Sequence, residues 1–543
     1  MATSSQAIPA SSLGPRATGF SGALSTRWGQ ALVPSLTDFF LIALFVWLFM
    51  AGANGWKVLL ADADTGWHIR TGEWILAHGR VPTEDLFSFS KPGAPWFAWE
   101  WLSDILFAEL FHAAGFKAVV LFSGVLIVAF SGVVLRFAIW RGANPLAAGL
   151  AVLLAIGAAS THFLARPHVF TLIFLPVSIW LLEADRIRPS SRIWLLIPLT
   201  LLWTNLHGGW VVLIACLVLL VAGSSLEAWL GVRGWTSVLR YAAMTAACSA
   251  VTLINPYGIE LHGHILSYLR SDWIRNHVQE FMAPSFRNEG ELQFEALLIA
   301  GILLAGWLLR KRDITACLWI LFLGHSALTS LRHAPLYVSV AAPLVAAEAT
   351  LLWSQWARGK AKQSLAVIMD QIGQDLTPSF RRMTIWPVVL LVILMALPGV
   401  AWPTDFAAEI FPVRLIQQQQ QTLGSGRLLT TDQWGDYLIF HYAPKLKVFI
   451  DGRSDFYGSE FGDDYFRLMQ GAWDWNRILR KYRFEVALLP LAWPLGSLLK
   501  QDPEWRLVAN DGQALLFIRK TEPGAQAAQP GPGSRTKENP TEH

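Results

Sequence analysis

Apolar runs occupy about half of the region between residues 36 and 402, and nearly all charged residues in that region stand in the connections between the runs. A membrane-spanning helix needs ~20 apolar residues. The sequence therefore predicts a polytopic α-helical membrane protein with about eleven transmembrane helices, although several runs are short and the weakest, 193–203, could be re-entrant. The runs lie at residues 36–50, 117–140, 145–160, 169–182, 193–203, 210–230, 241–254, 294–309, 314–328, 336–352 and 385–402.

Basic residues are concentrated in alternate connections at one end of the apolar bundle, whereas the turns at the other end carry Asp, His, Asn and single arginines. An excess of Arg and Lys marks the cytoplasmic side of a membrane. The N-terminus is therefore expected in the cytoplasm, and an odd number of spans places the C-terminal domain outside. The basic connections contain Arg136, Arg141, Arg186, Arg188, Arg192, Arg233, Arg240, Arg310, Lys311, Arg312, Arg358, Lys360, Lys362, Arg381 and Arg382.

Composition divides the chain into four parts. Residues 1–34 are rich in Ser, Ala and Gly, and residues 521–543 in Pro, Gly and Gln, so both are expected to be disordered tails. Residues 35–402 form the transmembrane domain, with a large first outer loop at 54–116. Residues 403–520 alternate strand-like and helix-like segments and predict a small soluble α/β domain. The strand-like segments are 427–431, 447–451, 485–489, 505–508 and 514–519.

Charge and cysteine content exclude several classes of protein. The net charge is only +4, so no nucleic-acid partner is expected. The three cysteines, Cys216, Cys248 and Cys317, all stand in apolar runs without disulfide or metal-type spacing. They are expected to be core residues.

The first outer loop carries the richest set of polar residues. Asp62 and Asp64 are two residues apart, a spacing that can coordinate a divalent ion or activate an acceptor group. His68 follows Asp64 by four residues and would share its face of a helix. Glu100 stands between two tryptophans later in the loop. The alternative is a solvated loop with helix caps.

Three further outer turns each combine polar residues beside apolar runs. An ionisable residue at a membrane edge is costly and indicates function. Arg166 and Arg332 suit a phosphate or pyrophosphate, although an arginine can also reach the membrane interface as a simple anchor. The turns contain Arg166 and His168, Asn205 and His207, and Arg332 and His333.

The first outer loop closely resembles that of oligosaccharyltransferase catalytic subunits, and more broadly the chain is similar to the GT-C glycosyltransferase superfamily, which includes protein O-mannosyltransferases and bacterial lipid-carrier-dependent sugar transferases. This resemblance implies a catalytic Asp in the first outer loop and a polyprenyl-phosphate or polyprenyl-pyrophosphate sugar donor. It makes Asp64 the first and Asp62 the second catalytic or metal-binding carboxylate, with Mg²⁺ or Mn²⁺ as the possible ion. The matching residues are Asp62, Asp64, Trp67, His68, Arg70, the run from Gly79 to Pro82, and Asp85.

A second patch resembles the acceptor-binding motif Trp-Trp-Asp-Tyr-Gly of oligosaccharyltransferases. Here it contains Trp434, Asp436 and Tyr437, but Gly435 stands in place of the second Trp. Recognition of an Asn-x-Ser/Thr acceptor is therefore not expected to follow the family pattern. The outer turns instead resemble those of a bacterial branch grouped with the GT-C enzymes, which implies the bacterial inner membrane.

The sequence thus predicts a membrane glycosyltransferase that takes a lipid-linked sugar donor and glycosylates a lipid, glycan or protein acceptor at the outer face. The alternative is a transporter, flippase or assembly factor for a polar lipid or glycan. A transporter is disfavoured because the polar residues gather at one face and not in mid-span. The expected roles are catalysis by Asp64, Asp62, His68 and Glu100; phosphate binding by Arg166, His168, Arg332 and His333; and acceptor or cavity contacts by Asn205, His207, Trp434 and Asp436.

Overall fold

The computed structural model describes residues 32–520, with gaps at 52–54, 383, 397 and 399. The described chain divides into two compact units. The first runs to Asp85, continues over Gly93–Ala407 and includes Ser454–Phe456; the second consists of Leu86–Pro92, Ala408–Arg453 and the chain from Tyr457. The expected tail at 521–543 lies outside the described residues, as does the tail at 1–34 except for its last three residues.

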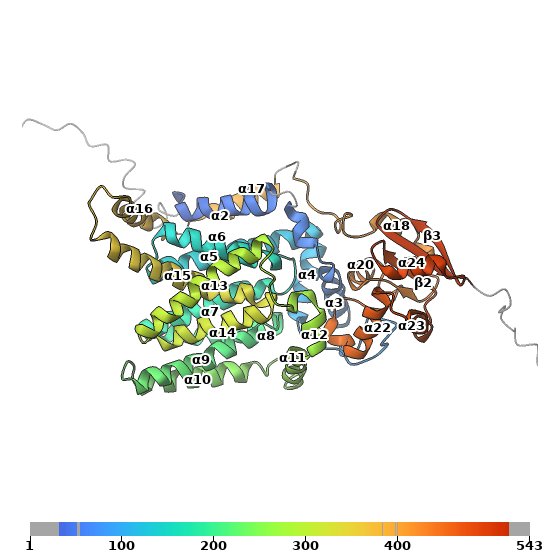
Figure 1. The fold of residues 1–543 in the computed structure, drawn as a ribbon, viewed down its shortest axis with the longest axis horizontal. Coiled ribbons are helices and arrows are strands. Elements are labelled where there is room, and N and C mark those ends of the chain that lie inside the picture. Colours follow the sequence, from blue (N-terminus) through green and yellow to red (C-terminus); the bar gives the residue numbers. More distant parts are fainter. Residues whose placement is uncertain (1–31, 52–54, 383, 397, 399, 521–543) are drawn as a thin grey trace, which may run out of the picture. The chain divides into compact units, whose positions relative to one another are not determined.

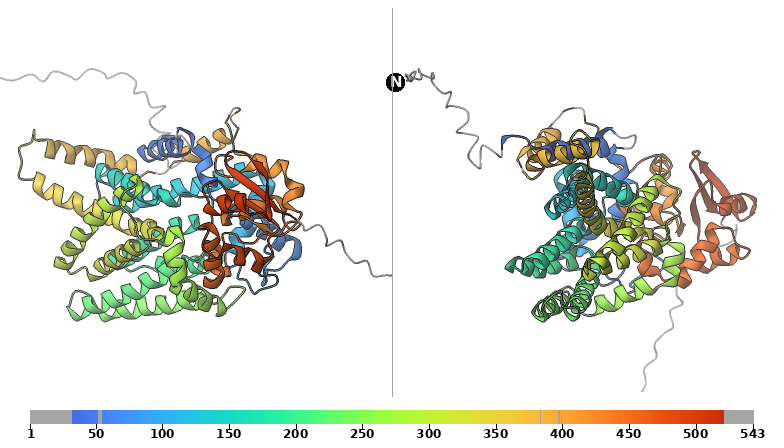
Figure 2. Two further views of the ribbon diagram at one scale, coloured as in Figure 1. Left: turned by 45° about the vertical axis from the view of Figure 1, so that its right-hand side comes forward. Right: turned by 60° about the vertical axis from the view of Figure 1, so that its left-hand side comes forward.

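The first unit is a helix bundle (Figure 1). Helix α5 is the longest element and packs against α2, α6, α7 and α15. Helices α9 and α10 run side by side (Figure 2). The helices are α2 Leu36–Val46, α3 Asp64–His78, α4 Trp101–Ala114, α5 Phe116–Arg141, α6 Pro145–Ala159, α7 Val169–Ile187, α8 Leu196–Leu206, α9 Trp210–Trp229, α10 Trp235–Val251, α11 Glu260–Arg270, α12 Asp272–His277, α13 Glu289–Arg310, α14 Ile314–Thr329, α15 Ala334–Ala357, α16 Leu365–Phe380 and α17 Trp386–Ala396.

Five helical segments of this unit are long and apolar enough to cross a membrane. They are 116–141, 145–162, 210–229, 290–310 and 331–357, and three shorter apolar helices accompany them. The predominantly helical character predicted from the sequence is confirmed. The count of about eleven spans is not confirmed, because several expected spans form helices such as α8, whose 11 residues are fewer than the ~20 that a crossing needs.

A buried ion-pair cluster ties together the ends of α5, α7 and α9 and the start of α14. Arg186 is its centre: it pairs with Glu183, with Glu227 at 3.2 Å and with Asp313 at 2.5 Å. Arg141 adds a bond to Glu183 at 3.2 Å. Buried charges are tolerated when they are paired in this way. Several arginines expected at the basic face thus have carboxylate partners within the helix bundle.

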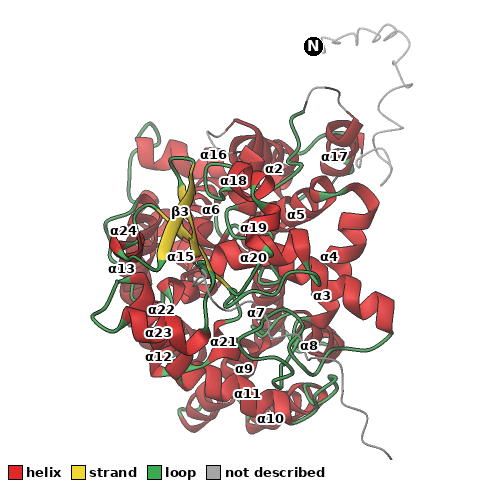
Figure 3. Cartoon of the chain, turned by 90° about the vertical axis from the view of Figure 1, so that its right-hand side faces the viewer, coloured by secondary structure: helices red, strands yellow, loops and turns green. Residues whose placement is uncertain are grey.

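The second unit contains one mixed sheet, whose strands are drawn in yellow in Figure 3. Its strand order is β1-β2-β4-β3. Strands β1 and β2 are parallel, whereas β4 pairs antiparallel with both β2 and β3. The strands are β1 Leu428–Leu429, β2 Val486–Pro490, β3 Trp505–Asn510 and β4 Ala514–Arg519. The helices are α18 Val413–Gln418, α19 Gln420–Leu423, α20 Asp432–Tyr442, α22 Ser459–Met469, α23 Trp475–Tyr482 and α24 Pro494–Gln501. The short helix α21 Ser454–Tyr457 belongs to the first unit except for its last residue.

One expected strand is absent from this sheet. In the segment 447–451, Val448 makes only an isolated bridge, with Ser88. Phe89 N donates to Val448 O at 2.9 Å, and Val448 N donates to Phe87 O at 3.0 Å. The apolar alternation of this segment therefore reflects side chains buried beside a short piece of the first outer loop, and the prediction of a strand there is wrong.

Helices α3 and α4 cross very closely at Gly72. A Cβ atom at this position would lie 2.0 Å from the backbone oxygen of Asp104 and 2.8 Å from the Cβ of Ala108. The glycine therefore allows the approach that brings His68 on α3 next to Asp104 on α4, where the two side chains bond at 2.6 Å. The candidate site depends on this crossing.

We expect Gly72→Ala to lower the free energy of unfolding by at least about 1–3 kcal/mol, because an extra methyl group in a packed crossing forces the helices apart. Thermal unfolding in detergent measures the change. Gly149→Ala on α6 is the matched control, since nothing lies within 4 Å of its added Cβ. A Gly72→Ala protein as stable as this control would show that the crossing tolerates expansion.

Candidate functional site

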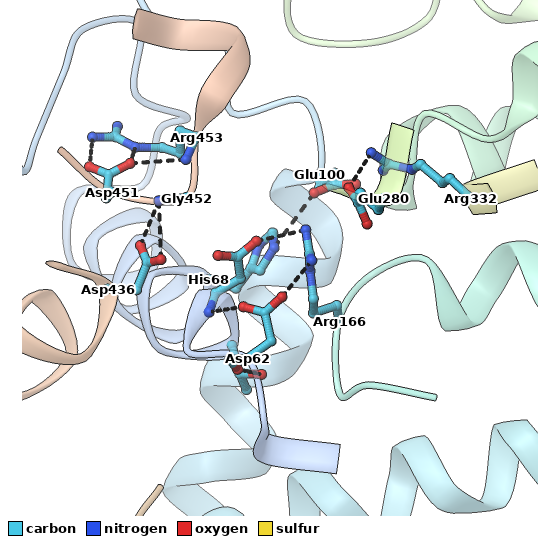
Figure 4. Close-up of polar contacts among 12 residues, drawn as sticks. Asp62, His68, Glu100, Arg166, Glu280, Arg332, Asp436, Asp451, Gly452 and Arg453 are labelled. Carbon is cyan, nitrogen blue, oxygen red and sulfur yellow. Dashed lines mark hydrogen bonds and ion pairs between the residues drawn. The ribbon is translucent and has the colours of Figure 1, made fainter. Parts of the chain in front are cut away.

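Two carboxylates at the start of α3 share one arginine from the turn before α7. Arg166 Nη1 donates to Asp62 Oδ2 at 2.7 Å, and Arg166 Nη2 lies 2.6 Å from Asp64 Oδ2 (Figure 4). Asp62 Oδ1 in turn accepts the backbone N–H of Asp64 at 2.9 Å. A carboxylate at a helix N-terminus is also favoured by the helix dipole. The three residues predicted from two separate turns thus form one ionic cluster.

Backbone contacts fix the turn that carries Arg166. Ala165 N donates to Leu59 O at 2.8 Å, and Thr65 Oγ1 donates to Ala165 O at 2.8 Å. Burial alone would lower the pKa of the Arg166 guanidinium, but Asp62 and Asp64 outweigh it and raise that pKa. Arg166 is therefore a permanent cation held against both carboxylates.

One turn further along α3, His68 pairs with Asp104 of α4. His68 Nδ1 lies 2.6 Å from Asp104 Oδ1, and both side chains are buried. Burial lowers the pKa of His68, and it raises the pKa of Asp104. Both shifts favour a hydrogen-bonded pair without separated charges. The ring orientation set by Asp104 directs the other nitrogen, Nε2, toward Glu100 at 3.6 Å.

Glu100 lies between two histidines. Its Oε2 faces His68 Nε2, and its Oε1 lies 3.4 Å from His207 Nε2. Burial raises the pKa of Glu100 to about 8, against the opposing effects of Arg166 and Arg332. A carboxyl with a pKa near neutrality exchanges a proton easily under physiological conditions. Glu100 is therefore suited to acid–base chemistry.

The orientation of His207 follows from its neighbours. Gly209 N donates to His207 Nδ1 at 3.1 Å, so this nitrogen is an acceptor and the proton is on Nε2, which faces Glu100. Thr171 Oγ1 lies 2.7 Å from the same Nδ1 and accepts Trp203 Nε1 at 3.0 Å. A Cβ at Gly209 would lie 2.2 Å from Thr171 Oγ1, so the turn requires glycine.

Arg332 forms the second cationic point of the site. Its Nη1 donates to Glu280 Oε1 at 2.7 Å (Figure 4). The same nitrogen donates to Tyr268 Oη at 3.0 Å. Burial would raise the pKa of Glu280, but Arg332 outweighs it and the pKa falls to about 2. Arg332 also lies over the Phe281 ring at 5.0 Å. Arg332 and Glu280 are therefore both charged at neutral pH.

A cavity of about 240 Å³ opens between the helices beside these groups. One part of its wall is polar and the rest is apolar, contributed by α7, α9, α11, α14 and α15. The polar part includes Glu100, His162, His168, Thr171, His207, Tyr268, Ser326, Arg332 and His333. The apolar part includes Leu172, Val211, Val212, Ala215, Ile265, Leu269, Phe281, Phe322 and Leu336.

The structure gathers most of the predicted site residues of the first unit. His168 Nε2 donates to His162 O at 2.6 Å, and His333 Nδ1 lies 3.0 Å from Ser326 Oγ. Asn205 accepts Trp101 Nε1 at 2.9 Å and is not a cavity residue. Sequence reasoning did not select Asp104, Glu280, Thr171 or Tyr268 for the site. For Asp104, the available signal was its position four residues after Glu100, on the same helical face.

The remaining predicted residues, Trp434 and Asp436, belong to the second unit. Trp434 Nε1 donates to Ile410 O at 3.3 Å, and Asp436 accepts the N–H of Gly452 at 3.0 Å (Figure 4). A Cβ at Gly435 would lie 2.2 Å from Ile450 O. A tryptophan cannot occupy this position without moving the backbone.

The predicted Mg²⁺ or Mn²⁺ is not confirmed. The part of the chain that the structure describes contains no group of three or more His, Cys, Asp or Glu residues that could hold a metal ion. Mg²⁺ requires nearly octahedral oxygen ligands. One oxygen of each carboxylate, Asp62 Oδ2 and Asp64 Oδ2, instead faces the Arg166 guanidinium. The Asp62 and Asp64 pair does not fit a divalent ion.

Comparison with known proteins gives a likeness of structure alone. No model of a protein family and no curated protein matches the sequence. The crystal structure of the Archaeoglobus fulgidus oligosaccharyltransferase tethered with an acceptor peptide containing the NVT sequon matches with a TM-score of 0.51 and 10% identity, over 86% of this chain and 70% of that chain.

Two further structures match less well. The same archaeal enzyme in complex with Zn and sulfate has a TM-score of 0.48 and 10% identity, over 84% of this chain and 68% of that one. The arabinofuranosyltransferase AftD from Mycobacteria has a TM-score of 0.46 and 12% identity, over 90% of this chain and 40% of that one. The expected resemblance to oligosaccharyltransferases is confirmed at the level of the fold alone: this chain has the fold of the archaeal oligosaccharyltransferase.

Proposed function

We propose that the chain is a membrane glycosyltransferase that takes its sugar from a polyprenyl-phosphate or polyprenyl-pyrophosphate donor. The observation that carries this proposal is the cavity beside Glu100, in which an apolar wall adjoins a cationic and histidine-rich end. A polyprenyl chain needs an apolar wall, and its phosphate needs a cation. The shared fold with an oligosaccharyltransferase supports the same class of reaction.

Arg332 is the proposed contact of the donor phosphate, assisted by His168 and His333. All three line the cavity. In the free protein Arg332 is paired with Glu280, and a phosphate would replace or share this partner. Arg166 was also predicted to bind phosphate, but its two terminal nitrogens each face a carboxylate. It would contact a phosphate only by giving up one of these partners.

The proposed reaction is attack by an acceptor hydroxyl or amide at C1 of the donor sugar. A bond forms between the acceptor atom and C1 while the bond between C1 and the phosphate oxygen breaks. The lipid phosphate leaves with the electron pair, and Arg332 stabilises its charge. The acceptor proton passes to a carboxylate. Glu100 is the proposed proton acceptor, because it lines the cavity and its pKa is about 8.

Asp64 and Asp62 keep a proposed catalytic role as negative charges beside the reacting sugar, with His68 orienting Glu100. The resemblance to oligosaccharyltransferases supports Asp64 as the first of these carboxylates. His207 would contact the acceptor within the cavity. Asn205 would act from behind the cavity wall, through its hydrogen bond with Trp101. Trp434 and Asp436 are proposed to help bind the acceptor, which is a lipid, glycan or protein; no nucleic acid is involved.

The proposed setting is the bacterial inner membrane. In this arrangement the N-terminus is cytoplasmic, about eleven segments cross or enter the bilayer, and the α/β domain of residues 403–520 is outside. The positive-inside pattern of the connections supports this orientation. Membrane lipids and a lipid-linked sugar donor are then the expected partners.

A transporter or flippase for a polar lipid or glycan is the second candidate. The same cavity favours it, because an apolar wall beside a polar end can enclose a lipid head group without chemistry. Turnover separates the two proposals, since only the enzyme releases lipid phosphate from the donor.

We expect the purified protein in nanodiscs to release lipid phosphate from at least one radiolabelled polyprenyl-phosphate or polyprenyl-pyrophosphate sugar, and Asp64→Ala to abolish the release. Removal of a preorganised charge at a reacting centre costs about 100-fold or more in kcat. Asp272→Ala is the matched control, because its carboxylate is exposed and pairs only locally with Arg275. A folded protein that moves labelled lipid across the bilayer without releasing phosphate would support the transporter.

Turnover should rise as the pH increases through about 8, because Glu100 accepts the proton only in its ionised form and its pKa is about 8. Measurement of kcat between about pH 6 and about pH 10 covers this transition. Glu100→Gln should lose most of the activity together with this pH dependence, whereas Glu260→Gln, a change at an exposed position at the start of α11, should retain both. An unchanged profile in Glu100→Gln would remove Glu100 from the proton transfer.

We expect Arg332→Ala to raise the donor KM, or to lower kcat/KM, by about 10- to 100-fold, since a charge-assisted phosphate contact contributes about 1.5–3 kcal/mol. Steady-state kinetics over a range of donor concentrations gives the change. Arg275→Ala, which removes an exposed arginine, is the control. Unchanged kinetics in a folded Arg332→Ala protein would make this residue a structural partner of Glu280.

A further inference from the structure

We propose that Arg166 takes the place of a divalent cation between Asp62 and Asp64, so that sugar transfer by this chain requires no metal ion at this pair of carboxylates. The inference rests on the proposed glycosyltransferase function. It concerns the way in which the charge of the two carboxylates is compensated, and it assigns to Arg166 a positioning role in place of the phosphate contact.

The geometry of the guanidinium matches a bridging cation. Its two terminal nitrogens each bind a different carboxylate, Nη1 at 2.7 Å from Asp62 Oδ2 and Nη2 at 2.6 Å from Asp64 Oδ2. The planar fork of Arg suits such two-point pairing. Asp62 Oδ1 is also occupied, since it accepts the N–H of Asp64 at 2.9 Å. The guanidinium therefore occupies the position between Asp62 Oδ2 and Asp64 Oδ2 that a bridging metal ion would take.

The arginine is held in this position by the fold. The residue before it, Ala165, is bonded through its N–H to Leu59 and through its carbonyl to Thr65, one residue beyond Asp64. The residue after it is Pro167, whose ring restricts the backbone. The side chains of Arg166, Asp62 and Asp64 are 19%, 16% and 4% exposed. The fold therefore fixes the Arg166 side chain beside the two carboxylates.

The net charge of Asp62, Asp64 and Arg166 together differs from the net charge of the same two carboxylates with a divalent ion. A divalent ion would neutralise two carboxylates, whereas a single guanidinium leaves one net negative charge on the cluster. A negative charge next to a sugar carbon that develops positive charge during transfer is favourable, and the same charge repels the donor phosphate. Phosphate binding then falls to Arg332, which is the other arginine among the site residues.

Electron paramagnetic resonance of Mn²⁺ tests the inference without any donor. The full-length protein in nanodiscs is freed of metals with EDTA and titrated with Mn²⁺. We expect no bound Mn²⁺ that depends on Asp62 or Asp64 in the unmodified protein. Arg166→Ala should open the pair and bind one Mn²⁺, and the double change Arg166→Ala with Asp64→Asn should lose it. Arg70→Ala, which removes another arginine from α3, should bind no Mn²⁺.

Turnover gives an independent readout. We expect the unmodified protein to keep its rate in EDTA within about twofold, and Arg166→Ala to lose about 100-fold, with partial recovery on addition of Mn²⁺. Rescue by a metal ion would not follow from a merely structural role of Arg166. A rate in the unmodified protein that is lost in EDTA and restored by Mg²⁺ would overturn the inference.

The spectroscopic arm remains decisive if Arg166→Ala does not fold or if no donor is turned over. One Mn²⁺ bound to the unmodified protein, and lost in Asp64→Asn, would overturn the inference whatever the reaction. The absence of bound Mn²⁺ from the unmodified protein supports the inference. Failure of every donor would count against the glycosyltransferase function and would leave the result on the metal site in force.

Discussion

The ionic cluster of Arg166, Asp62 and Asp64 is the interaction on which the candidate site depends. It joins the start of α3 to the turn before α7, and those elements carry His68 and His168. Buried charges are stable only when they are paired, and removal of one partner leaves the other charges uncompensated. The arginine therefore fixes the spacing of the outer turns in addition to compensating two carboxylates. The neighbouring groups, Glu100 and Arg332, line the cavity within this frame.

Much of this site could be predicted from the sequence because charged residues beside apolar runs are rare and costly. The Asp-x-Asp pair, Arg166 and Arg332 were visible on that ground alone. Their partners were not, because a pairing such as that of Arg332 with Glu280 joins positions 52 residues apart in the chain. The role of Gly72 was equally hidden, since the crossing of two helices has no local signature.

The limits of prediction for the fold have a different cause. Apolar runs identify helices, but they do not show whether a helix crosses the whole membrane. Helix α8 is apolar, yet its 11 residues are fewer than the ~20 that a crossing needs. In the second unit, the alternation in β4 marked a real strand, whereas that of 447–451 reflected burial beside another segment. The alternation of apolar and polar residues does not by itself distinguish a strand paired in a sheet from an extended segment with one buried face.

The buried cluster around Arg186 has a mechanical consequence. Glu183, Glu227 and Asp313 stand at the ends of α7, α9 and α14 that are remote from the cavity, whereas the cavity residues Thr171, Val211 and Ser326 stand near the opposite ends. Because the ion pairs hold these three helices together at one end, the helices can move apart more easily at the other end. Small tilts about the clamped end would therefore widen the bundle on the side of the cavity.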